Sequence, residues 1–272
     1  MQEIMILQRV SDAAPANDAV RARRADDKAM LKAAANLTRD LNLPNAAIYW
    51  PDMLGSALIG YVALALTITA ASAGVAIAAG LVAVLALYRA GSFIHELTHL
   101  KPNAVPGFRL AWNLVFGVPL LAPSFLYEGV HNQHHAKTYY GTVNDPEYLP
   151  LALMKPWTIP LFLVAALLAP IGLLVRFGIL TPLSLLSPRL RETIVAKYSG
   201  LQINPLFRRP KPQGSFARDW ALQEAGASLW AIALLVMVAT GFIPLGSFAI
   251  FLFVASGVMF LNQVRTLVAH LW

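Results

Sequence analysis

The sequence predicts an all-α integral membrane protein built on two transmembrane helical hairpins, with about four spans and further membrane-embedded or interfacial helices. Composition is the first reason, because 57% of the 272 residues are hydrophobic and only 13% are charged. Soluble domains carry about 25% charged residues. The second reason is a series of uncharged runs that are long enough to cross a bilayer.

The chain divides into a polar N-terminal segment, residues 1–50, and a membrane domain, residues 51–272. Within the first segment, residues 26–41 have the pattern of a short amphipathic helix that lies on the membrane surface. The N-terminus lacks the apolar core and cleavage site of a signal peptide, so we expect it to stay in the cytoplasm. The net charge of +7 fits basic cytoplasmic loops, and it does not call for nucleic acid as a partner.

Two long uncharged runs predict the hairpins. Residues 53–88 contain no charged side chain and exceed the roughly 20 residues of one span. They therefore predict two helices that turn near residues 71–74. Residues 225–264 form a second uncharged run, which is interrupted by a Gly- and Pro-containing turn at 241–246. In the first hairpin, small residues at Ser56, Gly60 and Ala63 fit either close helix packing or simple compatibility with lipid.

Two shorter apolar runs are more ambiguous. Residues 110–127 contain two prolines and are flanked by histidines on both sides, so a re-entrant or interfacial segment is favoured over a span. Residues 156–187 are interpreted as a broken, membrane-embedded segment. The following loop, 189–218, holds seven Lys or Arg residues, which places it in the cytoplasm by the positive-inside rule. Both termini are then cytoplasmic, and a bacterial inner membrane is the expected location.

The histidines are the strongest functional signal. Five of the six lie in two short windows just outside apolar segments, and the sixth lies near the end: His95, His99, His131, His134, His135 and His270. Residues four apart share a helix face, so each window can present several imidazoles together. Imidazole suits zinc, copper, iron and nickel. The sequence therefore predicts a metal site at the cytoplasmic face, and the chain has no cysteine to contribute a thiolate.

The stretch HELTH at residues 95–99 also matches the zinc metalloprotease motif H-E-x-x-H, in which the Glu activates water. Such a protease needs one further distant ligand, and it has no use for a second cluster of three histidines. We therefore keep a membrane zinc metalloprotease only as a minor alternative. Glu96 is then expected to orient a histidine rather than to act as a base.

The two boxes, HxxxH at 95–99 and HxxHH at 131–135, resemble the first two histidine boxes of the membrane-bound fatty acid desaturases. Carotenoid ketolases and hydroxylases share these boxes. The stretches 140–148 and 262–270 are also similar to the family, and the resemblance covers about residues 45–272. The resemblance implies two irons held by His95, His99, His131, His134 and His135, with His270 as a further ligand. In one branch an Asn takes the position of Thr266.

The resemblance implies an O2-dependent fatty acyl desaturase that places a double bond in a membrane lipid, acyl-CoA or acyl-carrier substrate. Its electrons would come from a donor such as ferredoxin or cytochrome b5. A hydroxylase or ketolase acting on a carotenoid or another apolar lipid is the alternative. The family's third box, another HxxHH, does not occur before Trp272. The sequence is therefore expected to be truncated at its C-terminus, with an incomplete two-iron site.

Three charged features outside the boxes leave two interpretations open. The run Arg208-Arg209-Pro210-Lys211 fits either docking of an acidic electron donor or a simple positive-inside signal. Asp145 and Glu147 fit either loop capping or support of the histidines.

Overall fold

A computed structural model describes residues 26–39, 43–101 and 103–269, so His270 lies outside the described residues. The chain forms two units, Met1–Asn45 and Ala46–Trp272. In the first unit, residues 26–37 are helical, which confirms a helix within the predicted range 26–41. Its position on a membrane surface stays a prediction.

The second unit is helical wherever the described residues have regular structure, which confirms the all-α class. Its long helices are α2 (Ala46–Thr69), α3 (Ala73–His99), α6 (Thr158–Val175), α8 (Pro188–Tyr198), α9 (Gly214–Ala239) and α10 (Leu245–Ala269). Shorter elements are α4 (Phe108–Trp112), η1 (Asn113–Gly117), η2 (Ser124–Leu126), α5 (Val130–His134), η3 (Leu151–Leu153), η4 (Arg176–Leu180) and α7 (Thr181–Ser184).

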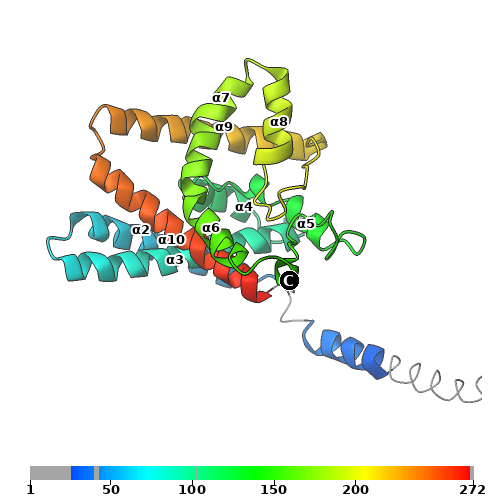
Figure 1. Cartoon of the computed structure of the whole chain (residues 1–272). Helices are drawn as coiled ribbons and strands as arrows, with labels where there is room; N and C mark the ends of the chain where they lie inside the picture. Colours follow the sequence, from blue (N-terminus) through cyan, green and yellow to red (C-terminus); the bar gives the residue numbers. More distant parts are fainter. Residues whose placement is uncertain (1–25, 40–42, 102, 270–272) are drawn as a thin grey trace, which may run out of the picture. The chain divides into compact units, whose positions relative to one another are not determined.

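Helices α2 and α3 form the first predicted hairpin, with its turn at residues 70–72 (Figure 1). The helices approach closely at Gly60, where an added Cβ would lie 2.6 Å from Leu87 Cγ. Gly60 and Ala63 are buried at this contact, as the small-residue interpretation predicts. Ser56 instead donates a hydrogen bond to Asp52 Oδ1 at 3.3 Å. The opposite faces expose large apolar side chains, as lipid-facing helices do.

Helices α9 and α10 form the second predicted hairpin, and its turn follows Gly241, which has a φ of +75°. The turns of both hairpins lie on the same side of Figure 1, so the two hairpins run in the same direction. Helix α10 packs against α2 and α3, and its residues Val254 and Val258 belong to the core that these helices share with α4. The hairpins therefore start and finish at a common end.

Among the described residues, five helices are long and apolar enough to cross a membrane, one more than the expected four. The additional one is Thr158–Ser184, which combines α6, the π-helical turn η4 and α7 into one uninterrupted helical run. The predicted break in 156–187 is therefore a π-turn rather than an interruption. In Figure 1 this run crosses the hairpin helices, and Ser256 of α10 donates to Leu167 O at 2.7 Å.

The segment 110–127 folds back on itself, and its re-entrant or interfacial place in a membrane stays a prediction. Asn113 closes the reversal by accepting a hydrogen bond from Ser124 N at 2.8 Å and donating one to Ser124 Oγ at 2.9 Å. Gln223 of α9 accepts from Phe125 N at 2.9 Å. The reversal brings the end of α3 and the start of α5 to the same side of the protein, where they are only 3.2 Å apart between His99 Nε2 and His131 Nε2.

A buried ion-pair network ties α8 and α9 to the crossing helix. Glu224 is 4% exposed and contacts Arg176 Nη2 at 2.5 Å and Arg191 Nη2 at 2.6 Å. Trp220 Nε1 donates to the same carboxylate at 3.2 Å. A buried carboxylate is tolerated only when its charge and lone pairs are matched, and here two guanidinium groups and an indole match them.

Replacing Glu224 with Ala leaves Arg176 buried without its counter-charge, so we expect a loss of about 3 kcal/mol in unfolding free energy. Denaturant unfolding in detergent micelles measures this loss. Glu192→Ala is the matched control, because Glu192 pairs with Lys211 on the exposed face of α8 and its removal should change stability little. Equal effects of the two substitutions would contradict the assigned importance of the buried network.

Candidate metal centre

Helix α3 carries the first two histidines out on its last turn. His95 and His99 lie one turn apart, with ring centroids separated by 4.7 Å. Glu96 sits beside them, with Oε1 3.5 Å from His95 Nδ1 and Oε2 accepting from the Tyr49 hydroxyl at 2.9 Å. This contact agrees with the expectation that Glu96 supports a histidine.

The short helix α5 brings the second box against the first. His131 Nε2 lies 3.2 Å from His99 Nε2 and 2.9 Å from His135 Nε2. The ligand-capable nitrogens of His95, His99, His131 and His135 all lie within 4.8 Å of one another. We call these four residues the four-histidine cluster.

His134 is not part of the four-histidine cluster, although the sequence groups it with His131 and His135. Its Nδ1 lies 2.9 and 3.0 Å from the two carboxylate oxygens of Asp145. His270 falls outside the described residues. The structure therefore brings four of the six predicted ligands together and places a fifth beside them with its own carboxylate.

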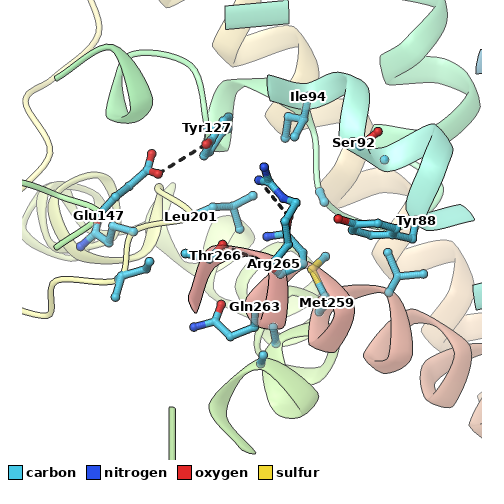
Figure 2. A pocket seen from close by; sticks show the side chains of 18 of the residues that line it. Tyr88, Ser92, Ile94, Tyr127, Glu147, Leu201, Met259, Gln263, Arg265 and Thr266 are labelled. Atoms are coloured by element: carbon cyan, nitrogen blue, oxygen red, sulfur yellow. Dashed lines mark hydrogen bonds between the residues drawn. The ribbon is translucent and has the colours of Figure 1, made fainter. Parts of the chain in front are cut away.

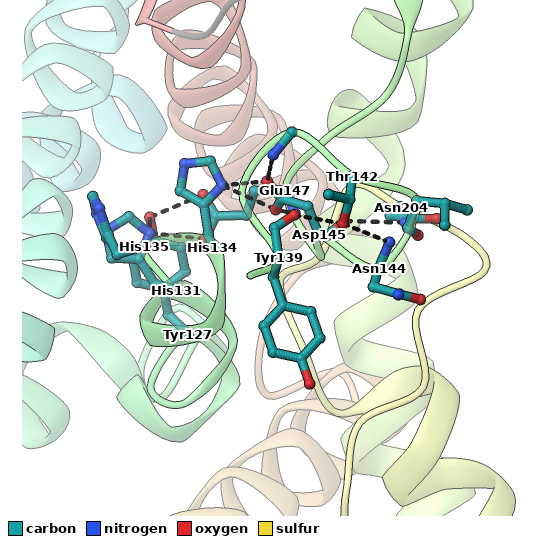
Figure 3. Close-up of polar contacts among 12 residues, drawn as sticks. Tyr127, His131, His134, His135, Tyr139, Thr142, Asn144, Asp145, Glu147 and Asn204 are labelled. Atoms are coloured by element: carbon teal, nitrogen blue, oxygen red, sulfur yellow. Dashed lines mark hydrogen bonds and ion pairs between the residues drawn. The ribbon is translucent and has the colours of Figure 1, made fainter. Parts of the chain in front are cut away.

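Buried carboxylates orient the second box (Figure 3). Glu147 Oε1 lies 2.8 Å from His131 Nδ1, and the Tyr127 hydroxyl lies 2.7 Å from the same nitrogen. Asp145 also accepts from the backbone of Gly141 at 2.8 Å and of Glu147 at 2.9 Å. Asp145 thus both caps its loop and supports a histidine, so both interpretations hold for it.

A second loop holds the carboxylate segment in place. Asn204 Nδ2 donates to Val143 O at 2.7 Å and to Asp145 O at 3.0 Å, and Ile203 N donates to Pro146 O at 2.9 Å. Nothing in the sequence marks Asn204 for this role, because its partners are backbone carbonyls. The 199–213 loop is therefore part of the support of the site.

Arg209 anchors the same loop through backbone carbonyl groups. It is 6% exposed, lies 4.3 Å over the Trp220 ring, and donates to the carbonyl oxygens of Ser199 and Glu128. Lys211 pairs with Glu192 at 2.8 Å. The interpretation of Arg208-Arg209-Pro210-Lys211 as one exposed docking run is therefore wrong for Arg209, which is a buried structural residue.

The residues present fit a bound metal ion. An imidazole nitrogen lies about 2.1 Å from a first-row divalent ion, so two such nitrogens on one ion lie roughly 3 Å apart. The separations of His131 Nε2 from its two neighbours match this value. Metal-binding histidines usually give their second ring N–H to a carboxylate, as His131 can to Glu147.

Local electrostatics also favour neutral ligands. Burial, followed by the nearby His131 and His99, lowers the pKa of His135, so this imidazole is neutral near pH 7 and able to bind a metal. Burial, followed by Glu147, raises the pKa of the Tyr127 hydroxyl above its usual range. Tyr127 therefore stays protonated and donates to Glu147 Oε2, 3.4 Å away.

A cavity of about 310 Å³ adjoins the cluster, between α3, α6 and α10. Its walls are mostly apolar, and they include Ile94, Phe116, Phe162, Ala166, Val258 and Met259. Tyr127 and Glu147, the two partners of His131, form part of the same wall and lie on the opposite side of Figure 2 from Tyr88. We call this space the apolar cavity.

Comparisons with known proteins define the class of this protein. The profile of the fatty acid desaturase family matches residues 70–272, so the chain belongs to this family. It is a membrane-bound, lipid-modifying oxidoreductase with several apolar helices and a histidine cluster. This family membership, rather than the five letters HELTH, defines the chemistry of the first box.

A particular relative of the chain is a ceramide hydroxylase of Caulobacter vibrioides (strain NA1000 / CB15N). It is 45% identical over 251 residues, which cover 92% of this chain and 71% of the relative. No solved structure gives a significant match. The name of this relative agrees with the hydroxylase alternative predicted from the sequence, although ceramide is not a carotenoid.

Glu147→Gln tests the support of His131. A neutral amide accepts a weaker hydrogen bond from His131 Nδ1 than a carboxylate does, so the imidazole is a weaker metal ligand. We therefore expect metal affinity to fall about 10- to 100-fold. Metal content after dialysis against a graded chelator measures this fall. Glu192→Gln removes an exposed carboxylate of the same size and should leave metal affinity unchanged. Unaltered affinity in Glu147→Gln would contradict its assigned role.

Proposed function

We propose that this protein is an O2-dependent hydroxylase of a ceramide-type lipid. The 45% identity to a ceramide hydroxylase across 92% of the chain carries the proposal. In the reaction one oxygen atom of O2 enters a C–H bond and the other leaves as water, with consumption of two electrons and two protons. A separate donor such as ferredoxin or cytochrome b5 supplies the electrons.

We propose iron as the metal and the four-histidine cluster with His134 as its ligands, with His270 as a further ligand. Support comes from the convergence of four imidazoles and from the carboxylates that orient His131 and His134. Zinc has no redox chemistry, and the chain lacks the thiolates that favour copper(I). When bound, iron supplies the activation of O2 that an unreactive C–H bond requires. Two irons per site remain the family-based expectation.

The chain's own residues bind and orient the reactants. Glu147 holds the proton of His131 on Nδ1, so that Nε2 faces the other histidines. Phe116, Phe162 and Val258 line the apolar cavity, where they would accept an alkyl chain and exclude water. We place the protein in a bacterial inner membrane with both termini in the cytoplasm, in keeping with its basic loops and its bacterial relative. This placement requires that the four hairpin helices span and that the run Thr158–Ser184 lies across them within the membrane.

A fatty acyl desaturase is the second candidate, because the family profile matches three quarters of the chain and names that activity. Hydroxylases and desaturases share the same histidine boxes, so the histidines do not separate them. The product does: a hydroxylase adds one oxygen atom to the lipid, whereas a desaturase removes two hydrogen atoms.

Incubation of the full chain with iron, a reducing system, isotope-labelled O2 and ceramide in vesicles tests the proposal. We expect mass spectrometry to find a ceramide that carries one labelled oxygen. His131→Ala should abolish the product, because it removes the central imidazole of the cluster. A product with a new double bond and no label would instead establish the desaturase.

A further inference from the structure

A second cavity, of about 310 Å³, lies at the same end of the protein as the histidines. It is lined by the first turns of α2, the last turns of α3 and the end of α10, and its polar lining residues are Tyr49, Asp52, Arg89, Ser92, His95, Glu96 and Arg265. We call it the polar cavity. Its position at the ends of membrane helices is the depth at which the head of a lipid lies.

The polar and apolar cavities adjoin. Ser92 and Arg265 line both of them. In Figure 2 Arg265 lies between Tyr127 on one side and Tyr88 on the other, in the middle of the apolar cavity's wall. Its guanidinium donates to Asn262 Oδ1 at 3.5 Å and interacts with the Tyr127 hydroxyl, and it forms no ion pair with a carboxylate of the described residues.

The four-histidine cluster lies beside this junction. His95 lines the polar cavity, and its ring centroid is 4.7 Å from that of His131. The partners of His131, Tyr127 and Glu147, line the apolar cavity. A lipid that occupies both cavities therefore passes the cluster where its head meets its chain.

We propose that the polar cavity binds the head of the lipid substrate and the apolar cavity its chain, so that the oxidised carbon lies next to the head. This inference rests on the proposed function and names the position of the reaction. Two pairs in the walls already bind each other, because the Tyr49 hydroxyl donates to Glu96 and Arg89 pairs with Asp52. Arg265 is then the charged donor that a bound head would meet. The lining holds two guanidinium groups and two carboxylates, so its charges balance and a neutral head with hydroxyl and amide groups matches it.

Product mapping on the unaltered protein is the direct test. Tandem mass spectrometry of the hydroxylated ceramide should place the new oxygen on a carbon adjacent to the amide carbonyl or to the diol. A hydroxyl in the middle of either chain would overturn this inference while leaving the hydroxylase intact. Absence of any ceramide oxidation would overturn the proposed function itself, and with it this inference.

Arg265→Gln tests the head subsite separately. Loss of a charged donor should raise KM for ceramide about tenfold or more, with iron content unchanged and kcat affected much less. Arg265→Lys keeps a donor and should recover part of the affinity. Arg189→Gln is the matched control, because Arg189 is exposed on α8 and lines neither cavity. It should leave KM unchanged.

A modified substrate distinguishes contact from a structural role of Arg265. Ceramide with its hydroxyls capped as methyl ethers should raise KM for the unaltered protein and have a smaller effect on Arg265→Gln, because the lost contacts are the same ones. If capping raised KM by the same factor in the unaltered protein and in Arg265→Gln, the proposed contact between Arg265 and the head would be wrong. If Arg265→Gln does not fold, the product map and the effect of capping on the unaltered protein still decide.

Discussion

The pairing of a buried carboxylate with an imidazole is the interaction on which the site depends. Glu147 and His131 are 4% and 3% exposed, so neither polar group has water to replace its partner. An unpaired carboxylate there would cost several kcal/mol. Hydrogen bonds hold the segment 143–147 in place, because Asn204 of the 199–213 loop donates to two of its backbone carbonyl oxygens. These contacts keep the loop that carries Glu147 beside His131.

The membrane helices solve a different part of the problem. Each hairpin starts and finishes at the same end, and there α2, α3 and α10 carry polar side chains into a shared space. The last turns of α3 carry His95 and His99. The fold-back of the chain, which Asn113 closes, places α5 beside them. The histidines lie close together because the ends of α3 and α5 lie close together. The lipid-facing parts of the helices contribute no histidine to the cluster.

The sequence could predict what depends on local pattern. Uncharged length located both hairpins, and the spacing of four within each box placed His95 with His99 and His131 with His135. The support of the site could not be predicted in the same way, since Asn204 and Arg209 bind backbone carbonyls that any sequence offers. Charge alone misassigned Arg209, because a guanidinium can be buried when carbonyls and an indole ring surround it. Length alone also failed to indicate that Thr158–Ser184 crosses the hairpins.

Hydroxylation and desaturation begin with the same demand, removal of one hydrogen atom from an unactivated carbon, and they use the same O2 and electrons. They differ in whether that carbon next receives oxygen or its neighbour loses a second hydrogen. The histidines are common to both, so the choice must lie in how the lipid is held. A head bound beside His95 restricts which carbons can approach the cluster. In our proposal, anchoring the head at the junction of the two cavities therefore determines which carbon meets the cluster, and the outcome depends on whether its neighbour can also approach.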